Sequence, residues 1–183
     1  MDNINTLLVA FMFITILTLG IASVLAELAE VVRHLGREKR DGLLVGWTLL
    51  LLFAYFTLFW HTSDITLLED WNFGLFLFAE TGPVLLLFAT QIMLGALSTD
   101  PDEDPDAAVR QGRFFAIFAL LGVWSICVGF VLGVGFTVAS AIDLVVIATC
   151  SLLAFSKSQT VHVAGLAVVW IAYLAGAVVD LAA

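Results

Sequence analysis

The sequence predicts an all-α integral membrane protein, a bundle of six transmembrane helices in a single domain of residues 1–183. Three observations lead to this fold class. Hydrophobic residues make up 62% of the chain and charged residues 13%, whereas soluble domains are roughly half apolar and about a quarter charged. The apolar residues form continuous runs, which excludes the alternating pattern of a membrane β-barrel. The few basic residues lie between these runs.

Six apolar segments are each long enough to cross the membrane, since about 20 helical residues span about 30 Å of hydrocarbon. They cover about residues 4–32, 42–60, 73–97, 114–135, 136–155 and 160–181. The first segment lacks the basic start of a signal peptide, because Met1–Thr6 contains Asp2 and no Lys or Arg. We therefore expect it to remain as a membrane helix. Only a short glycine-containing turn near 133–137 separates the fourth segment from the fifth.

The basic residues predict the orientation of the helices. All 7 Lys and Arg residues lie in the connections after the first, third and fifth segments. The positive-inside rule makes such connections cytoplasmic. The opposite connections, residues 61–72 and the turn near Gly135, contain no Lys or Arg. We therefore expect a multi-pass protein of a bacterial inner membrane, with both termini extracytoplasmic.

Charge and motifs exclude several classes of function. The net charge of −9 argues against nucleic-acid binding, which needs clustered Lys and Arg. The acidic connection at 98–113 has the composition of a solvated loop, and it lacks the ligand spacing of a calcium loop. No zinc-protease, nucleophile-elbow or phosphate-loop motif occurs. We expect no enzyme activity and no metal site, and we interpret Cys127 and Cys150 as packing residues.

Glu80 is the first candidate for a functional residue, because ionisable groups at membrane depth are costly. It lies roughly 10 Å into the third segment. Pro83 cannot donate to the carbonyl of Ala79, so Gly82 and Pro83 are expected to form a hinge beside Glu80. Gln91 returns to nearly the same helix face eleven residues later. Glu80 and Gln91 are thus expected to mark a polar track.

Asp143 is the second candidate, in the outer third of the fifth segment. Ser140 shares its helix face at a spacing of three residues. His61, at the outer end of the second segment, is expected at the same level. A carboxyl and an imidazole at one level suit proton handling or cation capture. We therefore expect Asp143, Ser140 and His61 to share an outer site with Glu80.

Two further patterns lie near helix ends. Glu27 and Glu30 are spaced to pair with Arg33 and His34, which predicts a cytoplasmic ion-pair network or, alternatively, a cytoplasmic vestibule. His34 and His162 are in principle haem ligands, but no second histidine pair supports them, and no cofactor is predicted.

Gly129 and Gly133 form a GxxxG pattern in the fourth segment. Small residues at this spacing let helices approach closely. The pattern predicts helix packing, either within one subunit or between subunits. Because six helices leave little room for a pore in one chain, we expect a homo-oligomer.

The segment from Trp71 to Phe115 resembles a group of small bacterial membrane proteins without an assigned function. The matching features are Trp71-Asn72-Phe73, Gly82-Pro83-Val84-Leu85-Leu86, the acidic loop, Arg110, and Arg113-Phe114-Phe115. The resemblance implies a six-helix protein and implies no activity.

These patterns favour a channel or transporter-like protein that passes protons, cations or a small solute. Glu80, Asp143 and Gln91 are expected to line its path, with His61 at the mouth. The alternative is a non-transporting membrane subunit that senses, scaffolds or assembles with partners, in which the acidic loop is the contact site.

Overall fold

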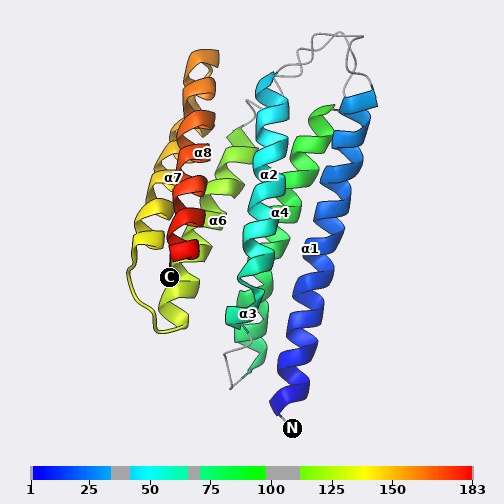
Figure 1. Ribbon diagram of the computed structural model, residues 1–183, viewed down its shortest axis with the longest axis vertical. Helices are drawn as coiled ribbons and strands as arrows, with labels where there is room; N and C mark the ends of the chain where they lie inside the picture. Colours follow the sequence, from blue (N-terminus) through cyan, green and yellow to red (C-terminus); the bar gives the residue numbers. More distant parts are fainter. Residues whose placement is uncertain (1, 34–41, 66–70, 98–111, 183) are drawn as a thin grey trace.

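A computed structural model describes residues 2–33, 42–65, 71–97 and 112–182, and every regular element in these ranges is a helix. The helices, shown in Figure 1, are α1 (Asp2–Arg33), α2 (Gly42–Trp60), α3 (Thr62–Ile65), α4 (Phe73–Leu97), α6 (Gly112–Val131), α7 (Val138–Phe155) and α8 (Gln159–Ala182). All except the short α3 are long and apolar enough to span a membrane, six in all within the described ranges. The predicted all-α class and the number of membrane-length helices are therefore confirmed.

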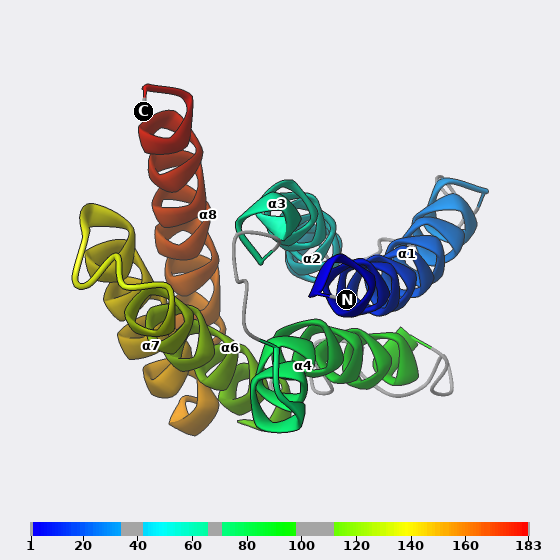
Figure 2. The same ribbon diagram turned by 90° about the horizontal axis from the view of Figure 1, so that it is seen from below.

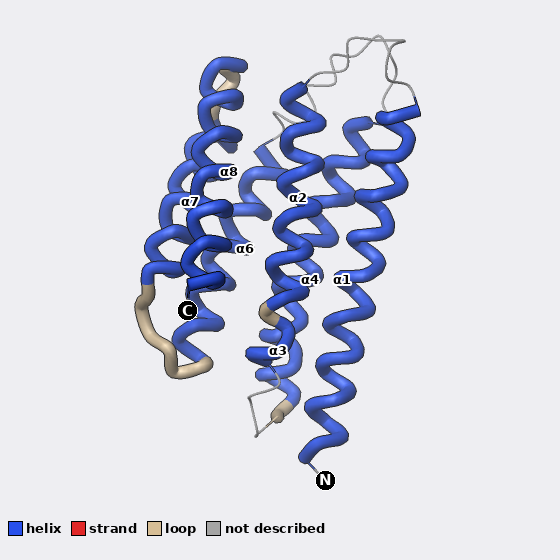
Figure 3. The backbone as a smooth tube through the Cα atoms, viewed as in Figure 1, coloured by secondary structure: helices blue, strands red, loops and turns tan. Residues whose placement is uncertain are grey.

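The turn between α6 and α7 is longer than predicted. The fourth segment was expected to run to residue 135, but α6 ends at Val131. Gly133 and Gly135 have φ angles of 74° and 73°, a left-handed conformation that glycine adopts without strain. Both glycines belong to the connection between α6 and α7, which Figure 3 draws as a tan loop. Because Gly133 lies in this turn, Gly129 and Gly133 do not share one helix face, contrary to the GxxxG prediction.

A capping box begins α7. The Thr137 side chain accepts a hydrogen bond from the backbone N–H of Ser140, and the Ser140 hydroxyl accepts one from the backbone N–H of Thr137. Each bond satisfies a donor that the first helical turn would otherwise leave unpaired. The predicted fifth segment therefore begins at Val138 instead of residue 136.

The six long helices form two groups. Figure 2 shows α1, α2 and α4 together on one side and α6, α7 and α8 on the other. The groups meet where α4 packs against α6 and where α2 packs against α8. Successive long helices run in opposite directions, so both termini lie at the downward-pointing ends of their helices in Figure 1, with the C-terminus well above the N-terminus. α3 and the α6–α7 turn lie toward the same end of the bundle.

Aromatic packing joins the groups toward the opposite end. The Trp47 ring of α2 is buried and makes edge contacts with Phe114 and Phe115 of α6, at centroid distances of 5.7 and 5.2 Å. The indole N–H of Trp170 in α8 donates to the carbonyl oxygen of Gly46 in α2 over 3.3 Å. Edge-to-face aromatic pairs add roughly 0.5–1.5 kcal/mol beyond the burial of their area. The two groups are thus held together at this end.

The outer surface of the bundle is apolar. Large hydrophobic side chains are exposed on each of the six long helices, among them Phe11, Phe56, Phe88, Phe130, Leu152 and Ile171. A soluble protein rarely exposes apolar patches of this extent. The surface is that expected of a protein whose long helices face lipid.

Candidate functional site

A cavity of about 350 Å³ lies between the two helix groups. All six long helices and the α6–α7 turn contribute to its walls. The contributing parts of α2 and α6 are their last turns, and those of α7 are its first turns. The cavity therefore lies toward the end of the bundle that carries the termini, away from the packing around Trp47.

Asp143 of α7 lines this cavity and has a polar partner. The side chain of Ser125, on α6, lies close enough to its carboxyl group to interact with it. Gly122, one turn before Ser125, explains the close approach of the two helices. A Cβ atom at Gly122 would lie 2.8 Å from Ile147 and 3.6 Å from the carbonyl oxygen of Asp143. The absence of a side chain at Gly122 lets α6 bring Ser125 to Asp143.

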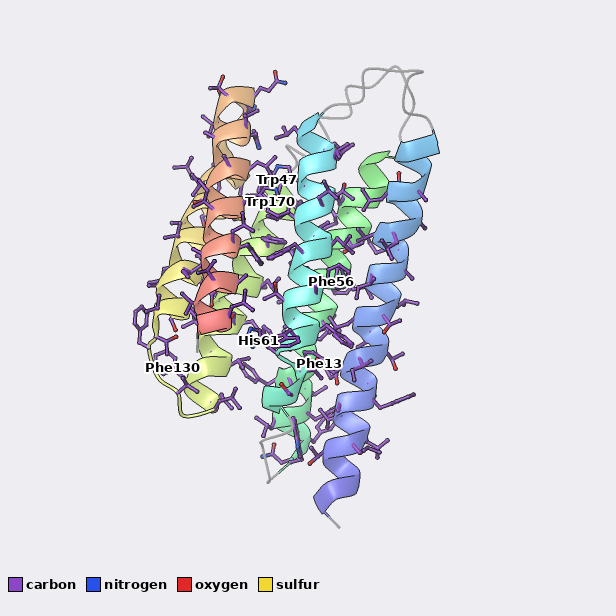
Figure 4. All side chains as sticks on the ribbon, viewed as in Figure 1. Phe13, Trp47, Phe56, His61, Phe130 and Trp170 are labelled. Atoms are coloured by element: carbon purple, nitrogen blue, oxygen red, sulfur yellow. The ribbon has the colours of Figure 1, made fainter. Side chains whose placement is uncertain are left out.

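His61 lines the same cavity from the end of α2. Its backbone N–H donates to the carbonyl oxygen of Thr57 over 3.1 Å, which continues the helical pattern past Trp60. Figure 4 shows His61 in the space between α2 and the C-terminal helices. His61 is close enough to Asp143 to interact with it electrostatically. The structure thus brings together two of the predicted titratable residues, from helices more than eighty positions apart in sequence.

Ser140 also lines the cavity and is buried. Its hydroxyl, however, takes part in the capping box with Thr137. Ser140 lies where the sequence placed it, one turn before Asp143. Its local hydrogen bonds are those of a residue that stabilises the start of α7.

Trp124 lies between the cavity and the part of α4 around Gly82. Its ring lies against Gly82, where any added Cβ would collide with it, and its indole N–H donates to the carbonyl oxygen of Phe78 over 2.7 Å. These two contacts flank Glu80 along α4. Because Trp124 lines the cavity as well, it separates the cavity from the stretch of α4 that carries Glu80.

Glu80 has a different environment from that of Asp143. Its side chain is only 6% exposed, and neither carboxyl oxygen has a hydrogen-bond partner within the described part of the chain. It is not among the residues that line the cavity. The structure therefore does not bring Glu80 into one site with Asp143 and His61. Gly82 and Pro83 are buried beside it, and α4 continues through Pro83 to Leu97.

Gln91 is exposed on α4, while its neighbour Thr90 is fully buried. The hydroxyl oxygens of Thr90 and Tyr55 are 2.9 Å apart and share a hydrogen bond between α4 and α2. The polar group that this part of α4 presents to the core is thus Thr90. Gln91 and Glu80 do not lie along one polar track in the structure.

The predicted cytoplasmic ion-pair network lies largely outside the described side chains. Glu27 is half-buried on α1, whereas His34 and the side chains of Glu30 and Arg33 lie outside the description. His162 is fully buried, and its Nε2 is hydrogen-bonded to the carbonyl oxygen of Ser156 at 3.1 Å.

Among the cavity residues that sequence reasoning missed are Ser125, Trp124 and Tyr173. Tyr173 of α8 is close enough to Asp143 to interact electrostatically. The one available signal was Gly122, a small residue one turn from Ser125, which marks where two helices can approach closely.

Among the side chains that the structure describes, no three His, Cys, Asp or Glu residues are grouped to hold a metal ion. Comparisons with models of known families, with curated proteins and with solved structures found no match.

Proposed function

We propose that this protein is a channel or transporter that moves a cation or a small solute, with the cavity around Asp143 as its binding site. The observation that supports this most strongly is a carboxyl group within a membrane-length helix that lines a cavity. Ionisable groups at membrane depth are costly, and they commonly mark ion and substrate pathways. Many transporters bind their substrate between two groups of helices. A ligand in this cavity would also lie between two helix groups.

In this proposal Asp143 binds the cation, Ser125 orients its carboxylate, and His61 stands at the mouth of the cavity. Glu80 and Gln91 are left out of the path, because Glu80 is buried with no polar partner among the described residues and Gln91 is exposed. A homo-oligomer remains part of the proposal, since six helices leave little room for a pore in one chain.

We further propose a bacterial inner membrane, with the basic connections cytoplasmic and both termini extracytoplasmic. The cavity then faces the extracytoplasmic side. To test this, single cysteines are placed in a variant without Cys127 and Cys150. An impermeant maleimide should label Val134→Cys in spheroplasts, and Ala107→Cys only after the membrane is permeabilised. The opposite pattern would reverse the orientation.

Transport is tested with purified protein in liposomes, under gradients of protons, Na⁺ and K⁺. Asp143→Asn should lower the flux at least about tenfold, because it removes a charged partner worth roughly 1.5–3 kcal/mol. Glu80→Gln is the matched control, a carboxyl-to-amide change outside the cavity, and should retain parental flux. Gel filtration of each variant checks that it is folded.

Parental flux through Asp143→Asn would remove Asp143 from the mechanism. Absence of any flux would instead favour the non-transporting subunit. That alternative is supported by Glu80, which is buried with no polar partner in the part of the chain that the structure describes.

A further inference from the structure

The charge of the cavity walls selects for cations. Among the described residues that line the cavity, Asp143 is the one acidic side chain, and none is Lys or Arg. His61 and Tyr173 are the other titratable residues that line the cavity. An anion would meet a carboxylate with no Lys or Arg to compensate it, whereas a cation gains a direct partner.

The volume of the cavity is too large for a bare ion. At about 350 Å³ it lies at the lower end of the range of small-molecule pockets, roughly 300–1,000 Å³. A water molecule takes up only about 30 Å³ of liquid. The cavity thus has the size of a small organic molecule.

The described side chains that line the cavity include one carboxylate, a poor ligand set for a hard divalent cation. Hard cations such as Mg²⁺ and Ca²⁺ take six or more oxygen ligands. Asp143 is the one carboxylate among the described residues that line the cavity, and the Ser140 hydroxyl is bonded within the capping box. An ammonium group needs fewer partners, because its own N–H groups donate hydrogen bonds to a carboxylate.

The remaining wall suits an apolar group. Phe13 of α1, Trp124 of α6 and Tyr173 of α8 supply aromatic rings, and Leu86 and Val146 supply aliphatic surface. Aromatic rings attract organic cations through their π faces as well as burying apolar groups. One carboxylate in an otherwise apolar and aromatic pocket is complementary to a molecule with one charged end.

Building on the proposed function, we infer that the ligand is a small organic cation. Its ammonium group binds the Asp143 carboxylate, and its apolar group packs between Phe13 and Trp124 on one side and Tyr173 on the other. His61, near the same carboxylate, faces the ammonium group from the mouth of the cavity.

The test uses benzylammonium as the probe and benzyl alcohol as its neutral match, with the full chain in lipid nanodiscs. Gly176→Cys provides a reporter, because Gly176 lines the cavity and a Cβ there meets no atom within 4 Å. Cys150 is replaced by Ala, and the exposed Cys127, which does not line the cavity, stays as an internal control. Alkylation of each thiol is followed by mass spectrometry.

Benzylammonium should slow alkylation at the Gly176→Cys position in a saturable way and leave Cys127 unaffected. Benzyl alcohol, and benzylammonium on the Asp143→Asn background, should each require at least about tenfold higher concentration, because each lacks one partner of a charge-assisted hydrogen bond. Ser125→Ala, a milder variant that keeps the carboxyl, should shift the curve less. Equal protection by the alcohol would overturn the inference.

The outcomes separate this inference from the proposed function. If benzylammonium gives no protection while inorganic-cation flux still depends on Asp143, the organic-cation inference is wrong and transport stands. If protection depends on Asp143 but no species is transported, the binding site stands and the transport proposal is wrong.

Discussion

Asp143 and Glu80 are both carboxylic acids in membrane-length helices, yet their surroundings differ. Asp143 lines a cavity and lies near the polar side chains of Ser125 and His61. Glu80 is more than nine-tenths buried, and its carboxyl oxygens have no partner among the described residues. Trp124 lies between the two environments. Depth in a membrane helix therefore does not alone determine the role of a carboxyl group, which also depends on its partners and on access to the cavity.

The largest effect on stability is expected from substitutions of Trp124, which lies between the two environments. Trp124→Ala should lower the free energy of unfolding by about 3–5 kcal/mol, because it removes a large buried side chain and leaves a void. Trp124→Phe keeps most of the ring and loses mainly the hydrogen bond to the Phe78 carbonyl, so it should cost only about 1 kcal/mol. Denaturant unfolding in detergent micelles measures both.

Equal stability of Trp124→Ala and Trp124→Phe would mean that the ring is not wedged between the cavity and α4. The separation of Glu80 from Asp143 would then lose its structural basis.

A smaller change in the free energy of unfolding, of opposite sign, is expected when Glu80 is replaced. Glu80→Leu should raise the free energy of unfolding by about 1–3 kcal/mol, since a buried polar group without a hydrogen bond is destabilising by roughly that amount. Asp143→Leu is the matched change, and we expect no gain there because it removes the interaction with Ser125. Thermal unfolding of the two variants gives the comparison. A loss of stability in Glu80→Leu would show that its carboxyl has a stabilising partner.

The six membrane-length helices were predictable because about 20 apolar residues in a row leave the chain few alternatives to a membrane helix. The residue at which α6 ends was not predictable in this way. Residues 132–136 are as apolar as a helix end, and only the positive φ angles of Gly133 and Gly135 show that the chain turns there.

The faces of the helices were also hard to predict. A membrane helix is apolar all round, so the pattern of α4 does not reveal that Thr90 faces the core and Gln91 faces outward. Counting residues along each helix was enough to predict that Asp143 and His61 lie at a similar depth in the membrane. The pairing of Asp143 with Ser125 did not, because it depends on how closely α6 and α7 approach at Gly122.

The smallest effects are expected from two serines that line the same cavity. Ser125→Ala should weaken transport or ligand binding about fivefold, the equivalent of one hydrogen bond of about 1 kcal/mol. Ser140→Ala should instead leave function unchanged and lower the free energy of unfolding by about 1 kcal/mol, because it removes half of the capping box. Flux and denaturant unfolding, measured on both variants, separate the two roles.

These serine variants are the sharpest test of the comparison, because the chemical change and the cavity are the same in both. If Ser140→Ala impairs function more than Ser125→Ala, the hydroxyl that matters is the one on the same helix as Asp143. The proposed orientation of the carboxylate by α6 would then be wrong. If only Ser125→Ala impairs function, a partner on the neighbouring helix is what makes Asp143 a binding group, and Glu80, without such a partner, remains a buried side chain.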